Sequence, residues 1–205
     1  MTYPDRTLRL PLVRGDNPPA EIVVTENGEP VNLSLGYVLR LTARQFVDDE
    51  ETLFSATSYP DGGIDVFDEE GDPAPEGTAL WFPEQADTET LVPSEIRFDI
   101  EITRRAGLVT DIGTAAVITG SRVVAFSGAD LTGVKRGHML FVDGAEGETQ
   151  GYRLITAVNV LAGTVTVDYD GWEDESGIDF AIYKTFRLTP ILGFFDVYGD
   201  LTLDD

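Results

Sequence analysis

The chain has 205 residues, with 37 acidic and 14 basic side chains, and its formal net charge is −23. This charge argues against nucleic acid or an anionic membrane as the main partner, because both are bound through clustered Lys and Arg. The chain contains no cysteine and one histidine, which excludes disulfides, thiolate chemistry and metal sites built from several histidines. Because 42% of the residues are hydrophobic, we expect a folded, highly acidic protein with few catalytic groups.

Alternating apolar and polar residues predict β-strands throughout the first half of the chain. The clearest alternation covers residues 96–103, and shorter runs cover residues 8–12 and 37–43. Turn-forming residues separate such runs. We expect Asn27-Gly28 to connect a β-hairpin, and Arg105-Ala106-Gly107 to form a turn before the next strand, at residues 108–113.

A second set of short strands is predicted at residues 117–126, 139–142, 152–158, 164–169 and 180–185, with glycines between them. Regularly spaced short strands with glycine-rich turns are typical of sandwiches and small barrels. The expected fold class is therefore all-β. We expect an immunoglobulin-like β-sandwich at residues 1–115, a small β-barrel or sandwich at residues 116–185, and a C-terminal arm or closing strand at residues 186–205.

The C-terminal segment is short, apolar and interrupted by glycine. It forms either a last strand that completes the second domain or an arm that buries its aromatic side chains on a neighbouring subunit. An apolar patch of this kind on a charged protein would promote aggregation unless it were covered. We therefore predict partner contacts at Ile191, Leu192, Phe194 and Phe195, and a homo-oligomer, with a trimer favoured.

Few residues suggest catalysis or ligand binding. His138, the single imidazole, precedes a predicted strand and is expected at the surface or at a strand edge rather than in a catalytic triad. Acidic loops at residues 65–72 and 168–175 carry the oxygen ligands that calcium prefers, but neither has EF-hand spacing. Aromatic residues near acidic ones could stack a sugar, namely Trp81, Tyr169 and Trp172. We predict no catalytic residue and no cofactor, and keep calcium or a carbohydrate as an alternative ligand.

The first half of the chain resembles a known family, the N-terminal β-sandwich domains of tailed-phage upper baseplate proteins and related tail appendage proteins. The order and spacing of turns and strands carry the resemblance: Gly15-Asp16, Asn27-Gly28-Glu29-Pro30-Val31-Asn32-Leu33, Asp61-Gly62-Gly63-Ile64, Arg97-Phe98-Asp99-Ile100-Glu101-Ile102, and Thr110-Asp111-Ile112-Gly113. The chain departs from the family pattern at Pro93-Ser94, where the family has Pro-Gly, and in an expanded loop at residues 68–77.

The resemblance implies structural work in a virion rather than catalysis. Its expected role is a non-enzymatic tail, baseplate or fibre-anchoring protein that acts by protein–protein assembly with other virion proteins. A capsid decoration or neck protein, or a calcium- or carbohydrate-binding β-module, is the alternative. The N-terminal residues show no secretory signal, and no segment has the length and apolarity of a membrane span. We therefore expect assembly in the host cytoplasm and a final location in the virion, with no nucleic-acid or membrane partner.

Overall fold

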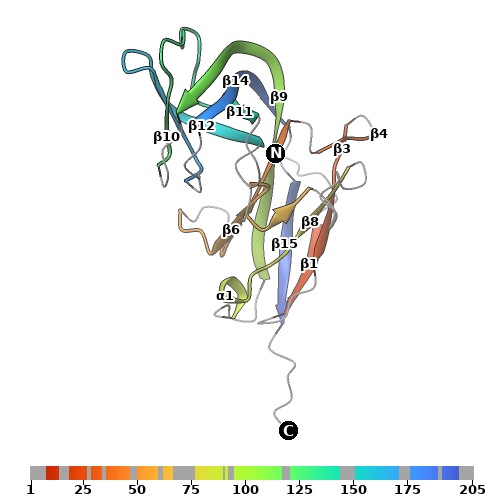
Figure 1. Ribbon diagram of the computed structural model, residues 1–205. Helices are drawn as coiled ribbons and strands as arrows, with labels where there is room; N and C mark the ends of the chain where they lie inside the picture. The colour runs from red at the N-terminus through yellow and green to blue at the C-terminus, as the bar shows by residue number, and fades with distance from the viewer. Residues whose placement is uncertain are drawn as a thin grey trace. The chain divides into compact units, whose positions relative to one another are not determined.

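The computed structural model describes residues 8–13, 19–26, 29–33, 36–46, 50–59, 62–66, 77–89, 91, 95–116, 121–143, 151–170, 176–188 and 191–198. These residues form β-strands joined by turns and a single short helix, α1 (Gln85–Thr88), so the predicted all-β class is confirmed (Figure 1). No helix in this described part is long and apolar enough to cross a membrane. The chain divides into two compact units. Unit 1 comprises Met1–Leu35, Leu39–Ile102 and Leu188–Asp205, and unit 2 comprises Gly36–Val38 and Thr103–Arg187.

Two larger sheets and one two-stranded hairpin make up the described part of unit 1. In the first sheet the strand order is β1 (Leu8–Val13), β15 (Ile191–Tyr198), β9 (Glu95–Ala116), β5 (Tyr37–Arg44) and β6 (Phe54–Thr57). The N-terminal strand β1 runs parallel to the C-terminal strand β15, while β15 runs antiparallel to β9. The second sheet contains β2 (Ala20–Val23), β8 (Thr78–Trp81) and β7 (Ile64–Asp65), all paired antiparallel.

An aromatic cluster fills the core of unit 1, and we define it as Phe54, Trp81, Phe98 and Phe195. The ring of Phe195 lies 4.4 Å from that of Phe98 and 5.0 Å from that of Trp81, measured between ring centroids. Phe54 stacks on Trp81 at 5.9 Å with an angle of 9° between the ring planes. The four side chains are between 0% and 5% exposed. They come from β6, β8, β9 and β15, so the cluster joins strands of both sheets.

A short hairpin in unit 1 pairs β3 (Thr25–Glu26) with β4 (Glu29–Pro30), with Glu26 opposite Glu29. These strands flank the predicted Asn27-Gly28 turn. The turn residues themselves lie outside the described part, as do Gly15 and Asp16.

Unit 2 is a closed antiparallel barrel. Its strands are the second part of β9, then β10 (Val123–Ala125), β13 (Thr164–Val167), β12 (Gly151–Asn159), β11 (Met139–Asp143) and β14 (Ser176–Arg187). Closure follows from the pairing of β9 with both β10 and β14. Closing the ring removes the exposed sheet edges that would otherwise pair with other chains. Apolar side chains from these strands fill its interior, among them Val124, Leu140, Ile155, Val165 and Phe180.

The turn predicted at Arg105-Ala106-Gly107 is wrong, because all three residues lie within strand β9. The backbone N–H of Arg105 donates a hydrogen bond to the carbonyl of Gly36 at 2.7 Å. The Arg105 side chain donates to the Tyr152 hydroxyl at 2.5 Å, and its guanidinium lies over the Tyr183 ring at 5.2 Å. These contacts with residues distant in sequence keep the backbone extended. Gly36, which accepts the backbone hydrogen bond of Arg105, has φ = +86°, and a Cβ at this position would lie 2.6 Å from the Arg105 Cδ. The close approach of the Arg105 side chain therefore requires glycine at position 36.

The two compact units do not follow the predicted boundary at residues 115 and 116, which falls at the end of β9. The division between units comes after Ile102, so β9 supplies residues to both of them.

The C-terminal segment at residues 186–205 is also placed differently from either expectation. Its described part forms β15, which pairs with β1 and β9 in unit 1 (Figure 1). The strand therefore closes the first unit rather than the second, and it is not a free arm.

Replacing Phe195 with alanine should cost unit 1 about 3–5 kcal/mol of stability, because a buried ring is removed from the aromatic cluster. Val23→Ala, on strand β2 of the same unit, is the matched control and should change stability by less than about 1 kcal/mol, since Val23 is 57% exposed. Urea unfolding followed by tryptophan fluorescence measures both variants. Equal losses would contradict the assignment of Phe195 to the core.

Candidate functional site

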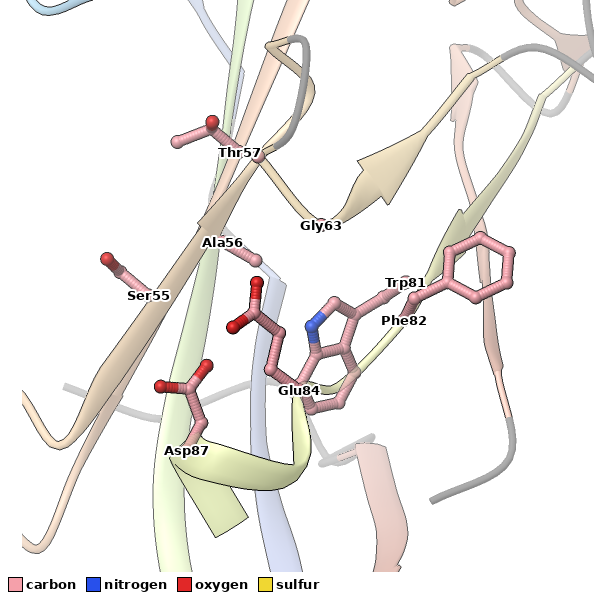
Figure 2. Close-up of a pocket in the computed structure, with 9 residues that line it drawn as sticks. Ser55, Ala56, Thr57, Gly63, Trp81, Phe82, Glu84 and Asp87 are labelled. Atoms are coloured by element: carbon pink, nitrogen blue, oxygen red, sulfur yellow. The ribbon is translucent and has the colours of Figure 1, made fainter. Parts of the chain in front are cut away.

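Three features of the described residues are candidates for function: a pocket in unit 1, the outer face of β15, and the turn that holds His138. The pocket, which we name the Trp81 pocket, has a volume of about 200 Å³. Its walls come from β6, the turn after it, the end of β8 and helix α1, and the residues are Ser55, Ala56, Thr57, Gly62, Gly63, Trp81, Phe82, Glu84 and Asp87 (Figure 2). All of them belong to unit 1.

Backbone hydrogen bonds fix the walls of the Trp81 pocket. The N–H of Phe82 donates to the carbonyl of Gly63 at 2.8 Å, and the N–H of Thr57 donates to the carbonyl of Gly62 at 2.6 Å. On the helix side, the buried Thr88 hydroxyl lies 3.3 Å from the carbonyl of Glu84, to which it donates. The pocket is therefore built on secondary structure and does not depend on a loose loop.

Trp81 forms the inner wall of this pocket. Trp81 is 3% exposed, and its ring packs against the rings of Phe54 and Phe195, which also lie 5.7 Å from each other. Figure 2 shows the indole nitrogen on the side of the ring that faces the Glu84 carboxylate, whereas the Phe82 ring points away. The indole N–H donates no hydrogen bond to any of the described residues. This donor therefore points into the open space of the pocket.

Two carboxylates, those of Glu84 and Asp87, reach into the same space (Figure 2). Partial burial, and then the negative charge of Glu84, raise the pKa of the Asp87 carboxyl above its usual value. Neither group forms an ion pair with a cation among the described residues. The pocket therefore concentrates hydrogen-bond acceptors and negative charge beside the indole N–H of Trp81.

The outer face of β15 is the second candidate. Side chains alternate along a strand, so the four predicted contact residues divide into two pairs. Phe195 and Ile191 share the inner face, where Phe195 is fully buried in the aromatic cluster, and this corrects its assignment as a partner-contact residue. Leu192 and Phe194 lie on the outer face with Tyr198, and the Arg97 guanidinium lies 5.0 Å from the centre of the Phe194 ring.

His138 occupies a turn in unit 2, immediately before β11. The imidazole Nδ1 of His138 accepts a hydrogen bond from the backbone N–H of Lys135 at 3.3 Å, and the backbone N–H of His138 donates to the Lys135 carbonyl at 3.1 Å. Burial, and then the positive charges of Lys135 and Lys184, lower the pKa of His138. The imidazole therefore stabilises a turn in its neutral form.

The predicted calcium and sugar ligands are only partly within the described residues. Asp168 accepts a hydrogen bond from the N–H of Leu154, and Asp170 forms an ion pair with Arg122 at 3.1 Å. Trp172 and residues 171–175 lie outside the described part, as do residues 67–72 of the other acidic loop. Among the described residues, no group of three or more acidic or histidine side chains is placed to hold a metal.

Two aromatic residues considered for sugar stacking are buried. Tyr169 is 9% exposed and lies under the guanidinium of the buried Arg153, 4.3 Å from ring centre to guanidinium carbon. Trp81 is 3% exposed and packs against Phe54 and Phe195 in the aromatic cluster. Neither ring offers a face to a sugar.

Sequence reasoning did not find Glu84 and Asp87. The segment that contains them has no motif. The opposite wall of the pocket, on β6 and the turn after it, lies more than 20 positions earlier in the chain. The only local signal is that two acidic residues lie three positions apart. They line a pocket only because the fold places Trp81 beside β6.

No protein-family model matches the chain, and no curated protein matches it either.

Lowering the pH from about 7 to about 5 should destabilise unit 2 through His138. The folded pKa lies below the unfolded value of about 6.5, so the unfolded chain binds the proton first and stability falls as the pH drops through this range. His138→Asn keeps an acceptor near the Nδ1 position but cannot titrate. Thermal unfolding across this range should therefore show a smaller loss for His138→Asn than for the wild type. Equal losses in both proteins would contradict this role of His138.

Proposed function

We propose that the protein is a non-enzymatic structural component of a tailed-phage virion, working by protein–protein assembly in the tail, the baseplate or a fibre attachment. The observation that carries the proposal is the outer face of β15, where Leu192 is 42% and Tyr198 52% exposed, with Phe194 between them. The family resemblance of the first half supports the same role.

The position of these side chains favours an interface. Strand β15 lies inside its sheet, between β1 and β9, so its solvent face, which carries Leu192, Phe194 and Tyr198 with Asp196 among them, is presented by a fixed backbone. Next to this row, Arg97 stacks on Phe194 and Arg44 forms an ion pair with Asp99 at 2.7 Å. Aromatic residues and arginine at the centre, with charged pairs around them, are typical of protein interfaces.

The occupant that we propose for this face is a second copy of the chain. The face offers both parts of an aromatic–arginine contact, Phe194 and Arg97, so that copies could exchange it across a shared interface. A formal charge of −23 disfavours close approach of copies through acidic surfaces, whereas this face carries large apolar and aromatic groups and an arginine beside the carboxylate of Asp196. A homo-oligomer, with a trimer favoured, is the expected state.

Light scattering of the purified protein tests the oligomer. The wild type should have the mass of an oligomer, and Leu192→Glu should reduce it to the mass of a monomer, because a charge would be buried without a partner at the interface. Leu161→Glu is the matched control, since Leu161 is fully exposed at the β12–β13 turn of unit 2. A monomeric wild type, or an unchanged mass for Leu192→Glu, would contradict the proposed use of this face.

Immunogold electron microscopy of particles of the encoding phage tests the location. Antibody against the chain should place gold at the tail tip or the fibres. Gold on the head or neck would retain the structural role but move it to a capsid decoration or neck protein. Particles that carry no gold, while control antibodies to known virion proteins label them, would contradict the virion assignment.

A further inference from the structure

The Trp81 pocket imposes a specific demand on anything that fills it. A ligand there can accept a hydrogen bond from the indole N–H of Trp81 and donate hydrogen bonds to the carboxylates of Glu84 and Asp87. Each such hydrogen bond adds to the binding energy, and more so where the acceptor is charged. The Trp81 ring is fixed by its packing in the aromatic cluster, and the backbone hydrogen bonds of Phe82 and Thr57 hold the strand end and the turn that line the pocket.

These requirements separate the classes of ligand. An anion such as phosphate or a carboxylate would meet two negative charges. A cationic side chain, lysine or arginine, would satisfy the carboxylates but has no acceptor for the indole N–H. A hydroxyl group both donates and accepts, so neighbouring hydroxyls on one ring can satisfy the carboxylates and the indole together. The pocket chemistry therefore favours a neutral polyhydroxy compound.

Size restricts the ligand further. A volume of about 200 Å³ is below the ~300–1,000 Å³ of pockets that enclose drug-sized ligands and cofactors. It is the size of one small ring, and the exposed positions of Ser55 and Glu84 leave its mouth open to a longer chain attached to that ring.

We propose that the Trp81 pocket is a binding site for a single neutral sugar ring, held by the carboxylates of Glu84 and Asp87 and by the indole N–H of Trp81. This site differs from the acidic loop around Trp172, and it is independent of assembly through β15. For a ligand of this size we expect a dissociation constant of about 1–10 mM. The raised pKa of Asp87 supports the site, because it reports a partly buried carboxyl close to another negative charge.

Two-dimensional ¹H–¹⁵N NMR of the full chain tests the proposal, because the chain has only two tryptophans and therefore two indole N–H signals. Trp172→Phe assigns the signal of Trp81. The probes are D-glucose, D-galactose, D-mannose and N-acetyl-D-glucosamine, each titrated at neutral pH. At least one should shift the Trp81 indole signal in a saturable way, together with the backbone signals of residues 84–87. No saturable shift with any of the four would overturn the proposal.

Variants and a competing ligand complete the test. Asp87→Asn should weaken sugar binding about 10-fold, since a hydrogen bond to a charged acceptor is lost, whereas Glu51→Gln, an equal change of charge at an exposed position, should not alter it. Leu192→Glu should bind the sugar like the wild type, so that failure of assembly and failure of sugar binding are told apart. A sugar-induced shift that Asp87→Asn leaves unchanged would overturn the site. A shift with L-argininamide but with no sugar would overturn it in favour of a basic side chain.

Discussion

The packing of Phe195 against Trp81 and Phe98 is the contact on which the rest of unit 1 depends. It brings a strand from the end of the chain into the middle of a sheet whose other strands come from the first half. Burying aromatic rings of this size supplies a large share of the stability of a small β-domain. Without β15, both β1 and β9 would lose a neighbour, and the faces of the Trp81 ring would lose part of their cover.

The same packing determines the two surfaces to which we assign function. Because side chains alternate along β15, turning Phe195 into the core turns Leu192, Phe194 and Tyr198 outward. Because Phe54 and Phe195 pack against the Trp81 ring, the ring is held at the pocket with its N–H on the side of the Glu84 carboxylate. The candidate interface and the candidate sugar site therefore both depend on the aromatic cluster. The interface lies on the outer face of β15, and the sugar site lies between β6, β8 and α1.

Unit 2 depends on closure rather than on a layered core. Strand β9 pairs with β14 along most of its second part, and its last residues meet β10 to complete the ring. Arg105 lies where this part of β9 begins, and its contacts with Tyr152 and Tyr183 join strands β12 and β14 to it. Inside unit 2, the buried Arg153 stacks on Tyr169, so a guanidinium takes part in the packing beside the apolar side chains. His138 adds a hydrogen bond to a turn, and its Nδ1 can accept that bond only while the imidazole is neutral.

The sequence by itself determined that the protein is all-β. Residues 96–103 alternate with a period of two, which is a local signal of a strand, and glycines separate short strands in the second half. The net charge and the shortage of histidine and cysteine likewise set limits on chemistry without any structure. Three features were decided only by tertiary structure: the strand that continues through Arg105–Gly107, the unit to which β15 belongs, and the pocket that brings Glu84 and Asp87 beside Trp81. Each depends on contacts between residues far apart in sequence. A local pattern cannot specify them, because the propensity of a short segment is weaker than the burial and hydrogen bonding that a distant strand provides.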